Sequence, residues 1–452
     1  MTIGNRVNGK PRLTDMSISS SNHSEETALQ AAETGVPGQA GVADRFTLYL
    51  VFLFLCLSTV GFVDSFATSF RYSMITYVRE DLGESFASIV GTFKWVYLGS
   101  CLSFVPRVLA DVFGRRLLLW ITMVGLSLLQ WALGFARTPH EYVLLLVLLA
   151  IFYKSDIWLL VMSEEAPPAH RGLCAALTVA FSCSGILVLG SLVHRMGDAP
   201  GAWRDVARFP VWGLLASIPI LLFVRETCHF KNTRPKLTPR LSWRLIRAPF
   251  QKEYRRRLIV MSVLKMFVAG GAVVMISLMG TEYLRVDNGF SQERIGRIIQ
   301  LDVVAIIAAW AIAGALSDRI GRHRCLYAFG LVFVISLLNL ALLPKGSIGV
   351  LIAYVAQACA ATGVYAILRV VTLELFPNDF RATASAWTDL FMTLFAAVTA
   401  WFLSIITNSP DSGGPGVSLT TCIICVALVL PLVLPLFGLL RETRGSRLEN
   451  IR

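Results

Sequence analysis

Twelve hydrophobic segments of about twenty residues each recur along the whole chain and set the strongest limit on its fold. A helical segment of that length crosses an apolar layer of about 30 Å. Of the 452 residues, 55% are hydrophobic and only 15% are charged, a balance far too apolar for a soluble protein. The segments are 46–68, 88–109, 117–136, 142–163, 173–194, 209–224, 258–283, 296–316, 325–344, 348–373, 382–407 and 417–440.

These segments predict an all-α integral membrane protein, because a single lipid-exposed segment satisfies its backbone hydrogen bonds only as a helix. We expect six transmembrane helices in 46–227 and six more in 258–441. Residues 1–45 have no apolar core and predict a disordered cytoplasmic tail rather than a cleaved signal peptide. Residues 228–257 form a basic cytoplasmic linker, and 442–452 form a second cytoplasmic tail.

The basic residues predict the orientation. Most of the 41 Lys and Arg fall in the tails and in those loops that are cytoplasmic if both termini are inside. The net charge of +12 therefore reflects topology and attraction to anionic lipid headgroups, and no nucleic-acid partner is expected. Within the linker, Leu241, Trp243 and Ile246 alternate with arginines, which favours an interfacial helix on the inner leaflet. A solvated basic loop is the alternative.

Signatures of enzymes and cofactor sites are missing from the sequence. It has no Gly-x-Ser-x-Gly elbow, no phosphate-binding loop of the Gly-x-x-x-x-Gly-Lys-Ser type and no His pair with metal spacing. Cys422 and Cys425 have the spacing of metal ligands but lie inside the last hydrophobic segment, where packing is the better interpretation. We therefore expect no enzyme activity, no ATP-driven pump within this chain, no cofactor and no metal.

Charged motifs recur in the two halves in the same order. RVLADVFGRR at 107–116 corresponds to GALSDRIGRH at 314–323. The pattern Glu-x-x-Pro-x-x-x-Arg begins at Glu164 and again at Glu374, and Arg-Glu-Thr begins at Arg225 and again at Arg441. Three motifs at nearly constant offset indicate a duplicated six-helix unit.

This architecture and these motifs resemble the major facilitator superfamily of secondary transporters, over about 46–450. The Gly-x-Leu-x-Asp-Arg-x-Gly-Arg pattern is complete from Gly314 to Arg322. The Glu-x-x-Pro-x-x-x-Arg pattern and the tail that begins Glu442-Thr443-Arg444-Gly445 look most like the sugar porter and organic ion transporter branches. The resemblance implies two pseudo-symmetric bundles that rock about a central site, which is alternating access.

The resemblance also implies a cytoplasmic gate, in which charged residues at the inner helix ends close the inner side in the outward-open state. Weak ion pairs suit a gate, because several of them together shift an equilibrium of a few kcal/mol. Positive-inside loops with ordinary helix caps are the alternative. We expect Asp111 to cap the helix that starts near Arg116 and to pair with Arg115. The expected gate residues are Asp111, Arg115, Arg116, Glu164, Arg171, Glu226, Asp318, Arg319, Arg322, Glu374, Arg381 and Glu442.

Ionisable residues inside the spans are costly and are therefore candidates for binding substrate or protons. The resemblance implies that spans 1, 4, 7 and 10 line the cavity, which favours Asp64, Lys154 and Arg369, with Asp64 and Lys154 as a pair. Lys94 and Lys265 either function or extend to the headgroups. Trp95, Tyr97, Tyr153 and Trp158 either stack on a planar ligand or pack. The candidates are Asp64, Lys154, Asp156, Asp302, Arg369 and Asp389.

Together these features predict a monomeric multi-pass transporter of the plasma or inner membrane. Its substrate would be a small polar or ionic organic solute, taken up by proton symport or facilitated diffusion. Span five lacks the Gly-Pro motif of drug–proton antiporters, so efflux is the less favoured direction. A non-transporting sensor on the same fold is the alternative from another class. In the first motif, Arg107 and Val112 replace a glycine and an arginine, which predicts a weaker N-terminal gate and a bias toward facing inward.

Overall fold

The computed structural model describes residues 48–103, 106, 109, 113–153, 157–166, 171–196, 201–227, 247–377, 380–408, 415–440 and 442. In this part of the chain every regular element is helical. The two tails that the sequence predicts to be cytoplasmic, at 1–45 and 443–452, lie outside the described residues. Most of the basic linker, at 228–246, and the interfacial helix expected there also lie outside them. These described helices belong to one compact unit.

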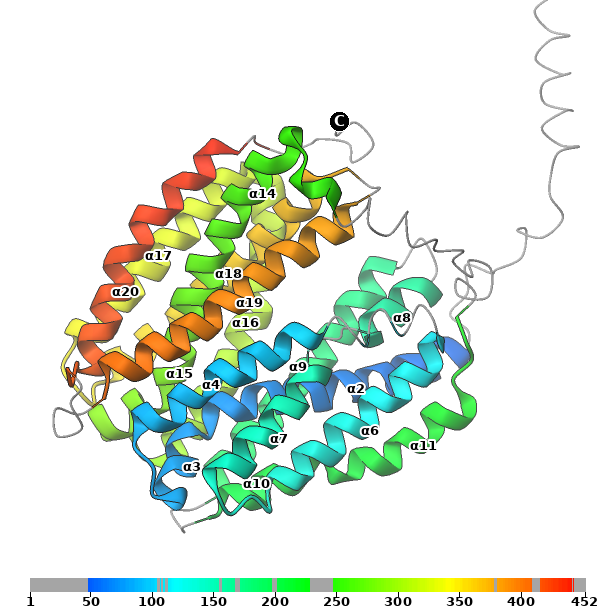
Figure 1. Cartoon of the computed structure of the whole chain (residues 1–452), viewed down its shortest axis with the longest axis horizontal. Helices are drawn as coiled ribbons and strands as arrows, with labels where there is room; N and C mark the ends of the chain where they lie inside the picture. Colours follow the sequence, from blue (N-terminus) through cyan, green and yellow to red (C-terminus); the bar gives the residue numbers. More distant parts are fainter. Residues whose placement is uncertain are drawn as a thin grey trace, which may run out of the picture. The chain divides into compact units, whose positions relative to one another are not determined.

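The N-terminal half begins with a long helix that carries both Asp64 and Arg71. Helix α2 packs against α8 and α9, and α6 packs against α7 and α11 (Figure 1). The elements of this half are α2 (Leu48–Ser73), α3 (Ile75–Leu82), α4 (Phe86–Ser100), η1 (Cys101–Ser103), α6 (Arg115–Leu133), α7 (Pro139–Phe152), α8 (Ile157–Glu165), α9 (Arg171–Arg195), α10 (Trp203–Arg208), η2 (Phe209–Trp212) and α11 (Gly213–Phe223).

The C-terminal half repeats the arrangement with longer helices. Helix α17 lies beside both α18 and α20, and α14 packs against α19 (Figure 1). The segment from Lys252 to Asp287 is continuous but contains two π-helical stretches, η4 and η5. The elements are η3 (Ala248–Phe250), α14 (Lys252–Lys265), η4 (Met266–Val273), α15 (Val274–Glu282), η5 (Tyr283–Asp287), α16 (Gln292–Ile320), α17 (Arg322–Leu342), α18 (Ile348–Leu375), α19 (Arg381–Ile406), α20 (Leu419–Val433) and η7 (Leu434–Leu439).

The helices confirm the predicted membrane spans. Eleven helical segments in the described residues are long and apolar enough to cross a membrane. The remaining predicted span, 88–109, corresponds to α4 and η1, beyond which parts of the chain up to 112 lie outside the described residues. The all-α membrane fold is thereby confirmed, and the predicted count of twelve helices is consistent with these segments.

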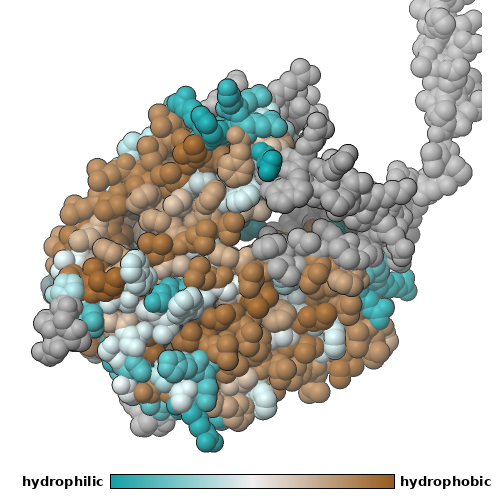
Figure 2. Space-filling view, in the orientation of Figure 1, coloured by the Kyte–Doolittle hydropathy of each residue, from teal (hydrophilic) through white to brown (hydrophobic). Residues whose placement is uncertain are grey.

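Large apolar side chains face outward along the middle of the helices. Figure 2 shows a broad hydrophobic surface over one face, with hydrophilic residues gathered toward the helix ends. Leu215 on α11, Leu331 on α17 and Leu432 on α20 are 71%, 60% and 76% exposed. Such a surface is stable in contact with lipid acyl chains and not with water. The structure therefore supports a multi-pass membrane protein.

Several helix pairs join the two halves. Helices α2 and α3 contact α15, α4 contacts α19, and α9 contacts α16. Helices α9 and α16 cross closely, because a Cβ atom built on Gly296 would lie 2.6 Å from the backbone nitrogen of His194. Glycine is therefore needed at this crossing, where any side chain would push the two halves apart.

Candidate substrate cavity and charged clusters

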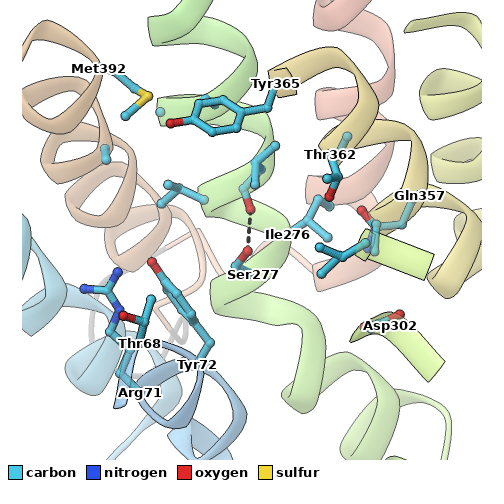
Figure 3. Close-up of a pocket in the computed structure, with 18 of the residues that line it drawn as sticks. Thr68, Arg71, Tyr72, Ile276, Ser277, Asp302, Gln357, Thr362, Tyr365 and Met392 are labelled. Carbon is cyan, nitrogen blue, oxygen red and sulfur yellow. Dashed lines mark hydrogen bonds between the residues drawn. The ribbon is translucent and has the colours of Figure 1, made fainter. Parts of the chain in front are cut away.

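A cavity of about 450 Å³ lies between the two halves. Ligand pockets for small molecules have volumes of about 300 to 1,000 Å³, so a small organic solute fits. The described lining comes from α2 and α4 of the N-terminal half and from η4, α15, α16, α18 and α19 of the C-terminal half. Arg71 and Asp302 are its two charged residues in the part of the chain that the structure describes, and Figure 3 places them on opposite sides of the cavity.

Arg71 is buried, with 2% of its surface exposed, although it carries a full positive charge. Its guanidinium carbon lies 4.6 Å from the centre of the Tyr72 ring, 5.7 Å from that of Tyr97 and 4.8 Å from that of Tyr153. The rings are fixed in turn, because the Tyr72 and Tyr97 hydroxyls are 3.0 Å apart and the Tyr153 hydroxyl donates to the Ala67 carbonyl. Aromatic faces attract a cation without occupying its N–H groups.

Two nitrogen atoms of this guanidinium, Nε and Nη1, have no hydrogen-bond partner among the described residues. Burying a charged donor without a partner is costly. A ligand that supplies acceptor oxygens at this position would remove the cost. Arg71 and its three tyrosines, Tyr72, Tyr97 and Tyr153, are called the arginine cage below.

Asp64 lies on α2 seven residues before Arg71, which puts it on the same side of the helix and about 10 Å away along the axis. The two side chains interact electrostatically. Asp64 does not belong to the described lining of the cavity. Its predicted partner Lys154 lies outside the described residues, as does Asp156, so the predicted pair remains a prediction.

Asp302 enters the cavity from the middle of α16. Its Oδ1 atom is buried and has no hydrogen-bond partner among the described residues. Gln357 and Tyr354 of α18 line the same part of the cavity, and Tyr354 interacts electrostatically with Asp302. A carboxyl group without a neighbouring cation is costly to ionise in such a place.

The remaining charged residues of the predicted site lie apart from Arg71. Arg369 on α18 is exposed and does not line the described cavity. The Asp389 carboxylate on α19 accepts a hydrogen bond of 2.8 Å from the ammonium of Lys265, which is only 1% exposed. That ammonium also donates to the Thr388 hydroxyl, at 2.9 Å. Lys265 therefore pairs inside the C-terminal half and does not extend to a headgroup. Lys94 lies over the ring of Trp95, at 5.6 Å.

A charged cluster at the start of α6 contains four of the predicted gate residues. The Arg115 guanidinium lies 3.2 Å from the Glu164 carboxylate of α8. The Glu226 carboxylate accepts hydrogen bonds from the backbone N–H groups of Arg115 at 2.7 Å and Arg116 at 3.3 Å. The Arg116 side chain donates to the Leu221 carbonyl. Glu226 therefore caps α6, while Asp111, the expected cap, lies outside the described residues.

The equivalent cluster at the start of α17 has the same geometry. Arg322 pairs with Glu374 at 2.8 Å and with Asp318 at 2.6 Å. Glu442 accepts hydrogen bonds from the backbone N–H groups of Arg322 at 3.0 Å and His323 at 3.1 Å. In both clusters the arginine that follows the motif glycine pairs with the glutamate of the second motif, and the glutamate of the third motif caps the helix. These contacts join helices of the same half.

The other predicted gate residues are less well placed for such contacts. Arg319 is exposed on the last turn of α16. Helices α9 and α19 begin at Arg171 and Arg381, but the structure does not describe the side chains of these two arginines. Arg107 and Val112 of the first motif also lie outside it. A Cβ atom built on Gly314 would meet nothing within 4 Å, so the glycine that opens the complete motif is not closely packed in this structure.

Ion pairs between the halves gather at the opposite helix ends. Arg79 of α3 makes two hydrogen bonds to Glu282 of α15, at 2.5 and 3.0 Å. Arg285 lies 3.2 Å from Glu80 and 4.4 Å from the centre of the Tyr77 ring. The four charged residues Arg79, Glu80, Glu282 and Arg285 are called the cross-half quartet below. Nothing in the sequence marked these four residues as functional, because they lie next to loops, where charge is ordinary.

Comparison with known families decides the identity of this fold. The family model of the Major Facilitator Superfamily matches residues 53–400, which is most of the chain. The chain belongs to this superfamily. It is thus a multi-pass membrane protein of a superfamily of transporters, as the motifs predicted.

Two named transporters are similar to this chain in sequence. A probable 4-methylmuconolactone transporter of Cupriavidus pinatubonensis is 24% identical over 360 residues, which cover 76% of this chain and 79% of the relative. A gallate transporter of Pseudomonas putida is 25% identical over 360 residues, covering 73% of this chain and 75% of the relative.

Solved structures of the superfamily share the fold at lower identity. A bacterial homologue of the human lysosomal transporter Spinster, in an inward-facing and unoccupied conformation, has a TM-score of 0.69 at 13% identity, covering 87% of this chain and 97% of the other. A D-xylose–proton symporter also has a TM-score of 0.69, at 16% identity with coverage of 88% and 99%. A mutant of the nucleoside transporter NupG has a TM-score of 0.71 at 11% identity, covering 86% and 100%.

Within this superfamily fold, Arg71 is the cavity residue that the sequence analysis missed. The hydropathy pattern ended the first span at residue 68 and left Arg71 in the following loop, whereas α2 continues to Ser73. One signal was present in the sequence. Asp64 and Arg71 are seven residues apart, so they share one face of any helix that includes both.

Proposed function

We propose that this chain is a secondary transporter that carries a small organic carboxylate across the membrane by alternating access. The observation that carries the proposal is the arginine cage, which holds a buried guanidinium with two nitrogen atoms unpartnered among the described residues. The cage faces a cavity between the two halves, where a bound solute would contact both of them.

A carboxylate is the ligand that best matches this site. Its two oxygen atoms match the fork of N–H groups on a guanidinium, and charge-assisted hydrogen bonds of this kind are roughly twice as strong as neutral ones. The tyrosine rings hold the guanidinium in place, so little side-chain freedom is lost on binding. A cationic solute would instead be repelled by Arg71.

The substrates named for the two relatives agree with this assignment. Gallate and 4-methylmuconolactone are both small cyclic compounds that carry one carboxylate group, and the corresponding transporters are 25% and 24% identical to this chain. The common feature is the carboxylate, so we extend that feature, and not either compound, to this protein.

We further propose that the two clusters around Arg115 and Arg322 lie on the cytoplasmic side and act as the inner gate. The excess of Lys and Arg at that end of the spans supports this orientation. The cross-half quartet would then lie on the outer side and keep it closed. We favour proton-driven uptake as the direction of transport. The transporting unit would be a monomer, and its basic linker would lie near anionic lipid headgroups.

The test is uptake by the purified full chain in proteoliposomes. Radiolabelled gallate, benzoate and 4-methylmuconolactone are the probes, with glucose and choline as neutral and cationic solutes. We expect uptake of at least one carboxylate and none of glucose or choline. Arg71→Gln should weaken apparent affinity by about 30-fold or more, because removing one partner of a buried charge pair costs about 2 kcal/mol or more.

Arg297→Gln is the matched control, because Arg297 is exposed and pairs with Glu293 of its own helix. It should transport as the unchanged protein does. If no carboxylate is transported, or if Arg71→Gln transports normally, the proposal is wrong. Carboxylate binding without flux, measured by calorimetry on the same protein, would instead favour a sensor on this fold.

A further inference from the structure

The second charge of the cavity, Asp302, is not explained by binding a carboxylate. It lies ten residues from the start of α16, about 15 Å along the helix, and is thus well inside the membrane span. Its Oδ1 atom is buried without a partner, and no described residue forms an ion pair with it. An anionic substrate at Arg71 would not benefit from a second anion in the same cavity.

We infer that Asp302 is the carboxyl group that takes up one proton together with the carboxylate substrate and releases it on the other side of the membrane. The inference rests on the proposed function, because it assigns the coupling ion of the same cavity. It assigns this role to the C-terminal half, at span eight, and not to Asp64 in span one.

Charge balance in the cavity supports this role. In the empty cavity, the negative charge of ionised Asp302 offsets the positive charge of Arg71. In the loaded cavity, the substrate carboxylate offsets Arg71, and protonated Asp302 is neutral. Both states therefore carry the same net charge across the low-dielectric interior, where an unbalanced charge would be costly. Asp64 adds the same charge to both states and does not change the comparison.

The surroundings of Asp302 allow the proton to be gained and lost. Helix α16 packs against α9, α17 and α18, and adjoins η5. On α18, Tyr354 interacts electrostatically with Asp302, and Gln357 also lines the cavity. The charged residues of α9, α17 and η5 lie in the end turns of those elements or next to them. Asp389 on α19, which also lies within a span of this half, pairs with Lys265. No described cation therefore holds Asp302 permanently ionised.

The order of events follows from these charges. A proton that enters from the outer side protonates Asp302, which lowers the negative potential in the cavity and favours binding of the anion at Arg71. After the halves rock, the substrate leaves, and Asp302 loses its proton to the inner solution. One proton and one monocarboxylate cross together, so the transport cycle with a monovalent substrate is electroneutral.

The test compares gradient-driven accumulation with exchange in proteoliposomes, using the carboxylate from the panel that the unchanged protein transports. A pH dye trapped inside the vesicles reports proton entry. We expect the unchanged protein to accumulate substrate under an inward proton gradient and to acidify the lumen when substrate is added. Asp302→Asn should lose both effects yet retain substrate exchange between equal pH values, because a neutral side chain mimics the protonated state.

Asp302→Glu, which keeps a titratable carboxyl, should restore gradient-driven accumulation, and Asp205→Asn should behave as the unchanged protein because Asp205 is 85% exposed at the surface. Accumulation by Asp302→Asn that responds normally to the gradient would overturn the inference. Loss of exchange as well, without rescue by glutamate, would also overturn it and indicate a structural role.

A second measurement needs no substrate. Infrared difference spectra of the reconstituted protein between acidic and alkaline pH should contain a carbonyl band of a protonated carboxylic acid that Asp302→Asn lacks. An unchanged band in Asp302→Asn would contradict the inference even if no carboxylate were transported. Failure of the proposed function instead appears as absent uptake in the unchanged protein, so the two failures are distinguishable.

Discussion

Arg79 in the N-terminal half and Glu282 in the C-terminal half form a two-point ion pair, with nitrogen-to-oxygen distances of 2.5 and 3.0 Å. The side chain of Glu282 is only 7% exposed and that of Arg79 19%. The pair joins the halves at the ends remote from the Arg115 and Arg322 clusters, so this structure has its outer side closed in the orientation that we propose.

Breaking this pair should therefore release the outer side. Removing one partner of a largely buried ion pair costs about 2 kcal/mol, which corresponds to roughly a 30-fold shift in the ratio of the two conformations. Glu282→Gln should therefore raise the ratio of outward-open to inward-open molecules by about 30-fold. Double electron–electron resonance between spin labels on α3 and α15, in a background without native cysteines, measures the change as a longer distance.

The exchanged pair Arg79→Glu with Glu282→Arg should restore part of the short-distance population, and Asp205→Asn is the control at a surface ion pair within one half. If Glu282→Gln leaves the distance distribution unchanged, the cross-half quartet does not hold the outer side closed.

The crossing of α9 and α16 leads to a second prediction. Gly190 and Gly296 meet there, and a Cβ on Gly190 would lie 2.9 Å from the Gly296 carbonyl oxygen. Gly296→Val should therefore separate the two helices, raise the outward-open population and slow uptake. Crosslinking of a cysteine pair placed across α9 and α16 would report the separation as a lower yield.

Ala311→Val is the matched control, because Ala311 lies on the same helix and is exposed. If the cysteine pair crosslinks in Gly296→Val with the same yield as in the unchanged protein, the close approach of these helices does not hold the outer side closed.

Much of the fold could be predicted from hydropathy alone, because a lipid-exposed helix must be apolar over a fixed length. The duplication of the six-helix unit could be recognised in the sequence for a similar reason. Glycine, arginine and glutamate recur at the helix ends since each makes a short-range contact there, as Arg322, Glu374 and Glu442 do. Contacts of this kind leave the same pattern in both halves.

The cavity was harder to predict, because hydropathy locates the ends of a span only to within several residues. That error placed Arg71 in a loop and made Asp64 the prominent charge of α2. The tyrosines of the cage come from three separate elements, at positions 72, 97 and 153, and their convergence follows from helix packing that no local pattern encodes. For the same reason nothing in the sequence paired Arg79 with Glu282.

The two motif glycines, Gly114 and Gly321, provide a third prediction. Their backbone φ angles are 101° and 102°, with ψ of 154° at both, and each directly precedes the helix that its cluster caps. A side chain is strained at such an angle, which costs about 1 to 3 kcal/mol. Gly321→Ala and Gly114→Ala should each lower the melting temperature in detergent.

The matched control for this pair is Gly438→Ala, since Gly438 has no such angle and its nearest neighbour would be a flexible tyrosine hydroxyl at 3.2 Å. Equal melting temperatures for Gly321→Ala and Gly438→Ala would mean that the backbone at the motif relaxes, and that the glycine is not required by its conformation.

The Lys265–Asp389 pair gives a fourth prediction, which separates a buried pair from a lysine that extends to the headgroups. Asp389→Asn leaves the Lys265 ammonium buried with only the Thr388 hydroxyl among its described partners. Since the Asp389 side chain is 43% exposed, the loss should be about 1 to 3 kcal/mol, below the value for a fully buried pair. Replacing both residues, as Lys265→Met with Asp389→Leu, should recover most of the melting temperature, because no unpaired charge then remains.

A double variant that is as unstable as Asp389→Asn would show that these residues are needed for packing rather than for charge pairing. Unchanged stability of Asp389→Asn would show that Lys265 reaches water or a headgroup when its partner is removed.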